Sequence, residues 1–369
     1  MRHLTELMSS TPLISIEPPI PFLPIDETSP LHVARLRDSH GRAITDLRVS
    51  VTDRCNYKCV YCRTGEEDVS FTELPIEHYL RIIRVFVSLG IEKVRLTGGE
   101  PLLRSGLIEM IQELSSLRTT DGNKLDIALT TNGHLLESMA APLKSAGLNR
   151  ITVSMDAVDA DSFARITRVP RSFDRVLAGI RAARAVGLGP VKVNCVLLRG
   201  FNDDQIERFA EFSRTENVIV RFIEWMPLEE PSAAPDVRNW KPETVVPMDE
   251  IVSRLNTWRP LIDLAPNALS ETARRFTFDD GIGEIGIIAP VSRPFCGHCS
   301  RVRLTSDGKV RTCLFSQTDH DLYRILLSSK SDSELAAYIH NVISHKEARH
   351  HIGEPGFLKP SRNMVHIGG

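Results

Sequence analysis

Strand-like and helix-like segments alternate regularly through the first two thirds of the chain. Strands are expected at 46–52, 93–97, 126–130, 150–154, 191–197 and 218–223, with helical patterns between them that include 75–90, 105–117, 173–186 and 202–215. Because each strand returns through a helix, the strands should pair in parallel. We predict an α/β fold with a closed or partly open, six-stranded barrel of the TIM type. A flat dinucleotide fold is disfavoured, because no G-x-G-x-x-G follows the first strand.

Polar and reactive residues gather just after these strands. In α/β barrels the chemistry lies at the C-terminal strand ends. Here those ends carry a cysteine loop, Gly98-Gly99-Glu100, Thr130-Thr131-Asn132, Ser154 and Glu224-Trp225-Met226. The sequence therefore predicts an active site at this end of the barrel.

Prolines divide the chain into three parts. Six prolines between residues 12 and 30 indicate an extended arm over 1–35 rather than a secretory signal. The partial (βα)6 barrel is expected over 36–230. Four further prolines mark a linker, and 231–369 should form a smaller C-terminal iron–sulfur domain that begins with a helix at 248–258.

Composition excludes several classes of function. The net charge is −2 and no run of 18 apolar residues occurs, so neither nucleic-acid binding nor a membrane span is indicated. Seven cysteines in 369 residues are too few for a disulfide scaffold. Six of them fall in two groups of three, which favours reduced metal-binding thiolates and a cytoplasmic location. Cys195, alone in an apolar strand, is expected to be an inert buried thiol.

The first group, Cys55, Cys59 and Cys62, forms a C-x3-C-x2-C pattern on one loop. Four thiolates would close a [4Fe–4S] cluster, whereas three leave one iron open. The amino and carboxylate groups of S-adenosylmethionine suit that iron, and an electron from the cluster then breaks the cofactor to a 5′-deoxyadenosyl radical. A structural zinc loop is the alternative, although a nearby fourth ligand is missing.

The second group, Cys296, Cys299 and Cys313, has the spacing C-x2-C-x13-C and is followed closely by Arg301 and Arg303. A second [4Fe–4S] cluster with an open iron would bind a substrate nitrogen or oxygen directly. Zinc completed by His298 stays open as an alternative. His345, His350 and His351 lack a carboxylate or cysteine in metal spacing and are expected at the surface or behind the ligands.

The first loop and its surroundings resemble the radical S-adenosylmethionine superfamily. Tyr61 stands where that superfamily packs the adenine, and residues 98–101 match its GGEP motif. Over 36–369 the chain is similar to the GTP 3′,8-cyclase family, with the motifs DLRVSVTDRCNYKCVYC, VRLTGGEPLLR, LTTNG, VSMDA, VKVN, NDDQI, RFIEWM, FCGHCSRVRLTSDG and the final Gly-Gly. Arg63-Thr64 departs from the usual Met-Pro of the family, and the proline-rich arm is atypical.

This resemblance implies a reaction and a site. The radical would abstract the 3′ hydrogen of GTP, and the ribose radical would attack C8 of guanine. The product, (8S)-3′,8-cyclo-7,8-dihydroguanosine 5′-triphosphate, begins molybdenum cofactor (molybdopterin) biosynthesis. The resemblance makes the six cysteines ligands of two clusters and assigns Tyr61, Gly99, Ser154 and Met226 to S-adenosylmethionine. It assigns Arg48, Arg95, Thr130, Lys192, Arg301, Val302 and Arg303 to GTP, and Arg301, Arg303, Gly368 and Gly369 to catalysis.

Four cations within otherwise apolar strands agree with a triphosphate substrate. Arg48, Arg95, Lys192 and Arg221 are expected inside the barrel, where a buried charge is costly unless paired. Arginine forks and lysine charges suit phosphate oxygens, so Arg221 is added to the predicted site. Structural ion pairs are the alternative explanation.

The expected partners are GTP, an external electron donor and the next enzyme of the molybdopterin pathway, with the chain a monomer or homodimer. Two other functions stay open. One is another radical enzyme with an auxiliary cluster, such as a peptide maturase. The other is an iron–sulfur or zinc module that binds nucleic acid, which predicts a basic face with exposed aromatics, whereas only 6% of residues are aromatic.

Overall fold

The computed structural model describes residues 35–62, 73–228, 240–328, 331–360, 362 and 364–368. All of them belong to one compact unit, Val33–Gly369. The predicted arm (except Arg35), the departure at Arg63-Thr64, the domain boundary at residue 230 and Gly369 lie outside the described residues.

Six parallel strands form the centre of the fold. Each pairs with the next along the chain, which confirms the predicted parallel α/β arrangement. The strands are β1 (Asp46–Ser50), β2 (Lys93–Thr97), β3 (Asp126–Thr131), β4 (Arg150–Ser154), β5 (Lys192–Leu197) and β6 (Ile219–Glu224). Their bounds fall within two residues of the predicted ones.

The C-terminal part of the chain extends this sheet at both edges. Next to β1 lie β10 (Arg301–Leu304), β11 (Lys309–Arg311) and β12 (His320–Asp321); next to β6 lie β9 (Glu284–Ile288), β8 (Arg274–Phe278) and β7 (Leu261–Leu264). β10 runs parallel to β1, and β9 runs parallel to β6. In the described residues the sheet ends at β12 and β7, so the barrel is open. The sequence pattern did not predict these outer strands.

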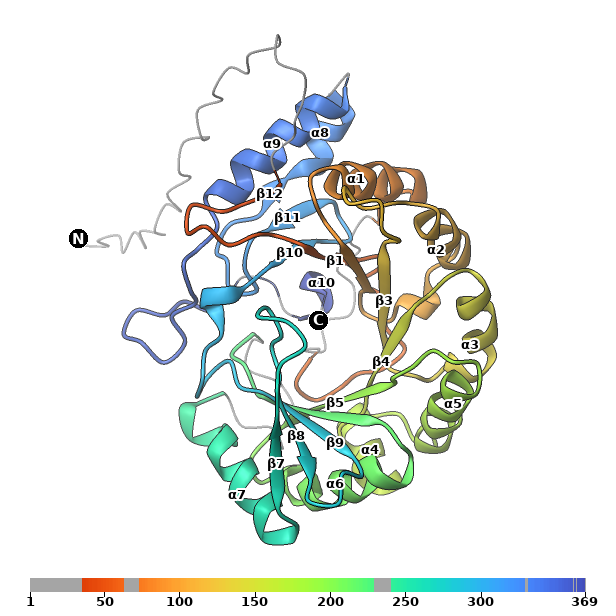
Figure 1. The fold of residues 1–369 in the computed structure, drawn as a ribbon, viewed down its shortest axis with the longest axis vertical. Helices are drawn as coiled ribbons and strands as arrows, with labels where there is room; N and C mark the ends of the chain where they lie inside the picture. Colours follow the sequence, from red (N-terminus) through yellow and green to blue (C-terminus); the bar gives the residue numbers. More distant parts are fainter. Residues whose placement is uncertain are drawn as a thin grey trace, which may run out of the picture. The chain divides into compact units, whose positions relative to one another are not determined.

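Helices cover the outside of the curved sheet, and the last short helix lies inside it (Figure 1). The outer helices of the barrel are α1 (Ile76–Ser88), α2 (Leu107–Ser115), α3 (Leu136–Ser145), α4 (Ala160–Thr167), α5 (Phe173–Ala185) and α6 (Ile206–Thr215). They are followed by α7 (Met248–Trp258), α8 (Leu322–Ser328), α9 (Asp332–Ser344) and the inner α10 (Met364–Ile367). None of the described helices is long and apolar enough to cross a membrane.

The two faces of the central strands differ in polarity. Apolar side chains of the outer face are fully buried beneath the helices, for example Leu47 and Val49 on β1 and Val220 and Phe222 on β6. Each such side chain contributes about 1.5–3 kcal/mol when it is buried. Since this outer layer supplies the core, the alternate positions facing the barrel interior are free to be polar.

Candidate active site

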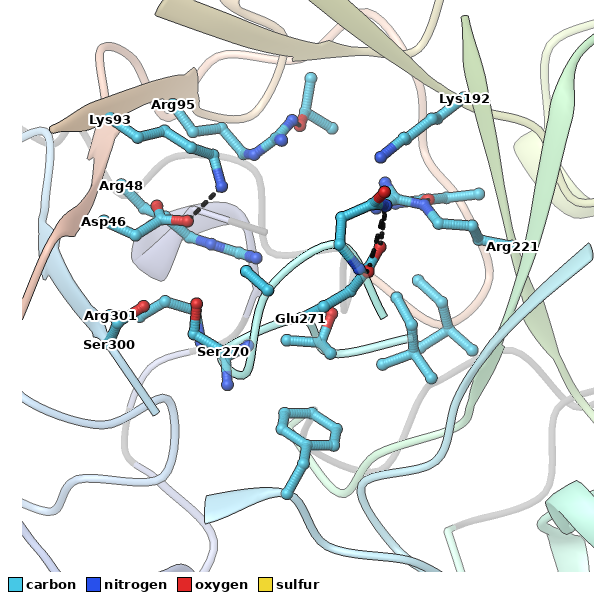
Figure 2. Close-up of a pocket in the computed structure, with 18 of the residues that line it drawn as sticks. Asp46, Arg48, Lys93, Arg95, Lys192, Arg221, Ser270, Glu271, Ser300 and Arg301 are labelled. Atoms are coloured by element: carbon cyan, nitrogen blue, oxygen red, sulfur yellow. Dashed lines mark hydrogen bonds and ion pairs between the residues drawn. The ribbon is translucent and has the colours of Figure 1, made fainter. Parts of the chain in front are cut away.

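A cavity of about 1150 Å³ occupies the barrel interior. Figure 2 shows the charged side chains that point into it from β1, β2, β5, β6 and β10. The lining residues include seven that were predicted from the sequence: Arg48, Arg95, Thr130, Lys192, Arg221, Arg301 and Arg303. Val302 is different, because it lies on the opposite face of β10 with 0% exposure. Strand alternation thus leaves only its main chain for a ligand in the cavity.

The two cysteine groups lie at opposite ends of the barrel. Cys55, Cys59 and Cys62 follow the C-terminal end of β1. Cys296 and Cys299 precede β10, which is parallel to β1 and pairs Arg301 with Asp46 at the N-terminal end. Cys313 follows β11, which runs antiparallel to β10 and so returns to that same end. All three cysteines of the second group line the cavity, and every described cysteine is free of disulfides.

The cations around the middle of the cavity are held by neutral oxygens. Arg95 donates to the hydroxyls of Thr130 and Thr152, both at 3.2 Å. Arg221 donates to Oδ1 of Asn194 at 2.9 Å and to the Thr152 hydroxyl at 3.3 Å. Within the described ranges, no carboxylate forms an ion pair with Arg48, Arg95, Lys192, Arg221 or Arg303. The structural ion-pair explanation therefore does not hold for them.

Burial and mutual repulsion disfavour the charged forms of these side chains. Burial, and then the charges of Arg303 and Arg301, lower the pKa of the Arg48 guanidinium. The pKa of Lys192 falls to about 8, because of burial and then of Arg221 and Arg150. Burial and the neighbouring Arg95 lower the pKa of Arg221 to about 9. A polyanion bound among them would relieve both penalties.

One layer toward the N-terminal strand ends, the charges are paired. Lys93 bonds Asp46, and Arg150 bonds Asp126. Every second residue of a strand points inward. The pair Asp46–Lys93 therefore lies two residues nearer the N-terminal strand ends than Arg48 and Arg95, which are level with each other. Positive charge without a described carboxylate partner thus lies in the middle layer, and it continues toward the second cysteine group through Arg301, which is level with Asp46. Glu271, from the loop between β7 and β8, points into the space occupied by Lys192 and Arg221 (Figure 2).

The GGEP segment packs directly on the chain that leads into the first cysteine loop. Gly99 donates its N–H to the Thr52 carbonyl, and Glu100 donates its N–H to the Arg54 carbonyl, both at 2.7 Å. A Cβ on Gly99 would lie 2.4 Å from the Arg54 carbonyl oxygen, so only glycine permits this approach. The backbone of this loop is therefore held within contact distance of the GGEP turn.

Glu100 ties this turn to the end of β3. Its carboxylate accepts the Thr131 hydroxyl at 2.7 Å and the N–H groups of Asn132 at 2.7 Å and Leu102 at 2.9 Å. Complete burial raises the pKa of Glu100 to about 7, although these three bonds act in the opposite direction. A buried carboxyl with this many donors fixes the relative positions of two strand ends.

The first cysteine loop has the donor set that an iron–sulfur cluster requires. Cys55 Sγ accepts the Tyr57 N–H at 3.4 Å, and the Asn132 amide lies 3.9 Å from the same sulfur. Burial, followed by the negative charge of a Cys62 thiolate, raises the pKa of Cys59. Bound iron would relieve that repulsion, so the three thiols fit a cluster.

The residues predicted for S-adenosylmethionine surround the same strand ends. The Tyr61 hydroxyl donates to Oδ2 of Asp156 at 2.7 Å, and Asp156 also accepts the Val196 N–H at 2.8 Å. Burial raises the pKa of Asp156 to about 6. Ser154 ends β4, and Met226 follows β6 and lines the cavity. Tyr61, Gly99 and Ser154 are not among the residues lining the central cavity.

A buried lysine that the sequence analysis missed lies beside the second cysteine group. Lys346 is 3% exposed, and its ammonium donates to the main-chain carbonyls of Arg301 and Thr312. Arg301 donates to Cys299 Sγ at 3.5 Å. Burial raises the pKa of Cys299, but Arg301 and then Lys346 outweigh it and lower this pKa to about 7. The surroundings of this thiol thus favour a thiolate.

His350 is partly buried at the wall of the same cavity, which does not conflict with its expected place at the surface or behind the ligands. It lines the cavity and lies with its ring centroid 5.3 Å from that of Phe315, and burial lowers its pKa. Across the described residues, no group of three or more histidine, cysteine, aspartate or glutamate side chains converges to hold a metal ion, the two cysteine groups included. For those two groups it is therefore the number and type of donors, not their present spacing, that fits a cluster. His345 and His351 are exposed or partly exposed, as predicted.

The C-terminal tail enters the barrel. The Gly368 carbonyl accepts a hydrogen bond from Arg303, and the Gly368 N–H donates to the Met364 carbonyl at 3.0 Å. Gly368 has φ of 77°, and a Cβ there would lie 2.4 Å from the Thr97 hydroxyl oxygen. Both the backbone angle and the space therefore require glycine. Figure 1 shows α10 at the centre of the barrel.

This combination of an open parallel barrel, a C-x3-C-x2-C loop after β1 and a GGEP turn after β2 defines the radical S-adenosylmethionine class of enzymes. Residues 49–213 match the Radical SAM superfamily, and residues 218–352 match Molybdenum Cofactor Synthesis C. The fold is similar to the crystal structure of Streptococcus suis SuiB bound to S-adenosylmethionine, with a TM-score of 0.57 and 15% identity over 82% of this chain and 69% of that one.

Two curated relatives identify the particular family. GTP 3′,8-cyclase of Acidothermus cellulolyticus is 42% identical over 319 residues, which cover 84% of each chain. GTP 3′,8-cyclase of Streptomyces coelicolor is 42% identical over 340 residues, which cover 90% of this chain and 96% of that one. The chain belongs to the GTP 3′,8-cyclase family.

Proposed function

We propose that this enzyme converts GTP to (8S)-3′,8-cyclo-7,8-dihydroguanosine 5′-triphosphate, the first step of molybdenum cofactor biosynthesis. The observation that carries the proposal is a group of cations in the middle of the cavity, between two cysteine groups at opposite ends, that form no ion pair with any carboxylate of the described residues. A triphosphate supplies the negative charge that would pair with them there.

The first cysteine loop would hold a [4Fe–4S] cluster through Cys55, Cys59 and Cys62, with S-adenosylmethionine on the open iron. When bound, these groups supply the 5′-deoxyadenosyl radical that removes the 3′ hydrogen of GTP. Tyr61, Gly99, Ser154 and Met226 would orient the cofactor at the C-terminal strand ends. The enclosing barrel keeps water away from the reacting groups.

The substrate would lie across the cavity with its triphosphate among Arg48, Arg95, Lys192 and Arg221. Thr130 orients Arg95 through their hydrogen bond, and Asn194 orients Arg221 in the same way. Bidentate guanidinium contacts fix the phosphate geometry, while Lys192 adds a point charge. The reacting ribose is thereby held at one position relative to the C-terminal strand ends.

The second cysteine group would hold another [4Fe–4S] cluster that contacts the guanine. Three thiols that line the cavity, with Arg301 bonded to Cys299 and Lys346 beside it, fit a cluster with one iron facing the substrate. Arg301 and Arg303 lie between that cluster and the nucleotide. Arg303 also holds Gly368, so the tail would place main-chain groups beside the reacting ribose and base.

The reaction also implies partners. Reduction of the cluster requires an external electron donor, and the cyclic product passes to the next molybdopterin-pathway enzyme. The likeness to SuiB, at 15% identity, shows the fold alone and does not favour a peptide substrate.

An anaerobic assay with GTP, S-adenosylmethionine and dithionite tests the proposal. We expect the cyclic nucleotide as product and about eight irons per chain, since two [4Fe–4S] clusters hold four each. A zinc-loaded protein without iron, or iron-loaded protein that cleaves S-adenosylmethionine but never modifies GTP, would contradict it.

Deleting Gly368 and Gly369 should leave iron content and cofactor cleavage nearly intact while nearly eliminating the cyclic product. Full cyclase activity of that truncated chain would show that the tail has no part in the reaction.

A further inference from the structure

The segment that leads into the C-terminal tail is fixed by a buried ionic network. Arg362 donates to both carboxylate oxygens of Asp307, at 3.1 and 2.8 Å, and lies 2.5 Å from Oδ2 of Asp319. Asp319 in turn pairs with Arg311. Lys309 also lies 3.6 Å from Asp307, so three cations and two anions alternate in one chain of contacts.

Burial makes this network consequential. The side chain of Arg362 is only 11% exposed, and that of Arg311 is fully buried. Losing one partner of a buried ion pair leaves an uncompensated charge, whereas losing an exposed one has little effect. The position of the Arg362 side chain between Asp307 and Asp319 is therefore strongly favoured.

The same hairpin holds the tail at two points. Asp307 lies in the turn between β10 and β11 and binds Arg362, while Arg303 on β10 binds the Gly368 carbonyl. Helix α10 lies between these two attachments. Because both attachments belong to the β10–β11 hairpin, the hairpin sets the separation between Arg362 and Gly368.

The hairpin turn is also bonded to the chain that leads into the first cysteine loop. The Ser306 hydroxyl donates to Oδ1 of Asp53 at 2.6 Å, two residues before Cys55. The Thr305 hydroxyl donates to Oδ1 of Asp307 at 2.5 Å and so orients the carboxylate that Arg362 meets. Arg362 consequently fixes the tail relative to the first cysteine loop as well as to Arg303.

We propose that Arg362 is a positioning residue that anchors the C-terminal tail to the β10–β11 hairpin, so that Gly368 stays against Arg303 inside the barrel. This inference rests on the proposed role of the tail in GTP cyclisation. Arg362 itself contacts neither substrate nor cluster; it acts through the tail.

The test compares Arg362→Gln and Arg362→Lys with Arg349→Gln in the full-length, cluster-loaded chain. Arg349→Gln is a matched control, because it removes the same charge from the same C-terminal region. The side chain of Arg349 differs in being 57% exposed, and it pairs with Glu354. The first measurement is hydrogen–deuterium exchange of the peptide that contains residues 364–368. We expect exchange to be roughly tenfold faster in Arg362→Gln, intermediate in Arg362→Lys and unchanged in Arg349→Gln.

The second measurement is the yield of cyclic nucleotide per S-adenosylmethionine cleaved. Arg362→Gln should lower this ratio severalfold while cleavage continues. In a chain that also lacks Gly368 and Gly369, Arg362→Gln should lower the ratio no further, because its effect passes through the tail. If Arg362→Gln fails to fold, Asp307→Asn weakens the anchor while Arg362 keeps its pair with Asp319, and it should shift both measurements in the same direction by a smaller amount.

The two measurements separate the anchor from the function of the tail. Unchanged exchange of residues 364–368 in a folded Arg362→Gln variant would overturn the anchor. Faster exchange with an unchanged product ratio would support the anchor and overturn the proposed role of the tail in cyclisation. An additive loss in the truncated chain would overturn action through the tail.

Discussion

Raising the pH above 8 should weaken GTP binding through one side chain, Lys192. Its pKa is about 8, because burial and the charges of Arg221 and Arg150 disfavour the ammonium. A triphosphate beside it would raise that pKa toward the usual value of about 10.4. GTP therefore prefers the protonated form, and between these two values binding takes up a proton. The affinity must then fall as the pH rises.

The size of the effect follows from the fraction of charged Lys192 in the free protein. With a pKa of about 8, roughly 90% of the ammonium is present at pH 7 and about 10% at pH 9. GTP affinity should thus fall about tenfold over that interval, which corresponds to about 1.4 kcal/mol. Anaerobic calorimetry of the cluster-loaded enzyme without S-adenosylmethionine measures the affinity, and buffers of different ionisation enthalpy report the proton uptake.

The control is Lys192→Arg, because an arginine starts from a pKa about two units above that of lysine and keeps more of its charge over this range. It should lose most of the pH dependence and the proton uptake. Ionisation of GTP itself affects both proteins equally and so cancels in the comparison. If wild type and Lys192→Arg lose affinity in parallel, Lys192 does not bind the triphosphate as its ammonium form.

Four substitutions probe the other parts of the site. Cys59→Ala should abolish S-adenosylmethionine cleavage, whereas Cys299→Ala should retain some uncoupled cleavage without cyclic product; equal loss in both, with the other cluster still loaded, would contradict the division of roles. Arg95→Ala should weaken GTP binding by about 1.5–3 kcal/mol, the range for charge-assisted bonds, with both clusters present; calorimetry checks this, and an unchanged affinity would refute the contact. Gly99→Ala should reduce S-adenosylmethionine binding at least about tenfold, because its Cβ would lie 2.4 Å from the Arg54 carbonyl; equilibrium binding with normal iron content measures it, and wild-type affinity would show that the turn tolerates a side chain.

The sequence was sufficient for the central strands because their signals are local. Each is a short apolar run closed by glycine or polar residues, and β2 and β4 begin and end where predicted. Helix α4 was missed because it is only eight residues long and buries only three side chains, Phe163, Ile166 and Thr167. Its N-terminus is held by the Asp159 side chain, which accepts the Ser162 N–H at 2.8 Å.

The outer strands were missed for a different reason. β9 and β10 are short, and their places beside β6 and β1 depend on pairing across long stretches of chain. No local pattern encodes such a partner. The C-terminal part was consequently predicted as an appended domain, although its strands continue the barrel sheet.

The site residues also fall into two groups: those that stand out in the sequence and those that only the fold brings together. The cysteines, the GGEP turn and the strand cations stand out because their residue types are unusual at their positions. Lys346 does not, since a lysine in the polar stretch around residue 346 is typical of a solvated surface. Only the fold brings its ammonium to the carbonyls of Arg301 and Thr312, beside the second cysteine group. The network around Arg362 is equally invisible in the sequence, because Asp307, Asp319 and Arg311 become neighbours through the β10–β11 hairpin.

The polar interior of this barrel follows from the way its strands divide their two faces. A parallel strand buried on both sides is usually apolar throughout. Here β1 keeps Leu47 and Val49 for the helices and turns Asp46 and Arg48 inward. The parallel register brings Arg48 level with Arg95 on one side and with Arg303 on the other, which concentrates positive charge in one layer. That layer is unfavourable for the empty protein and favourable for a bound triphosphate. Burial of the outer apolar face stabilises the fold. The protein can therefore keep mutually repulsive cations at its centre, where they complement the charge of the substrate.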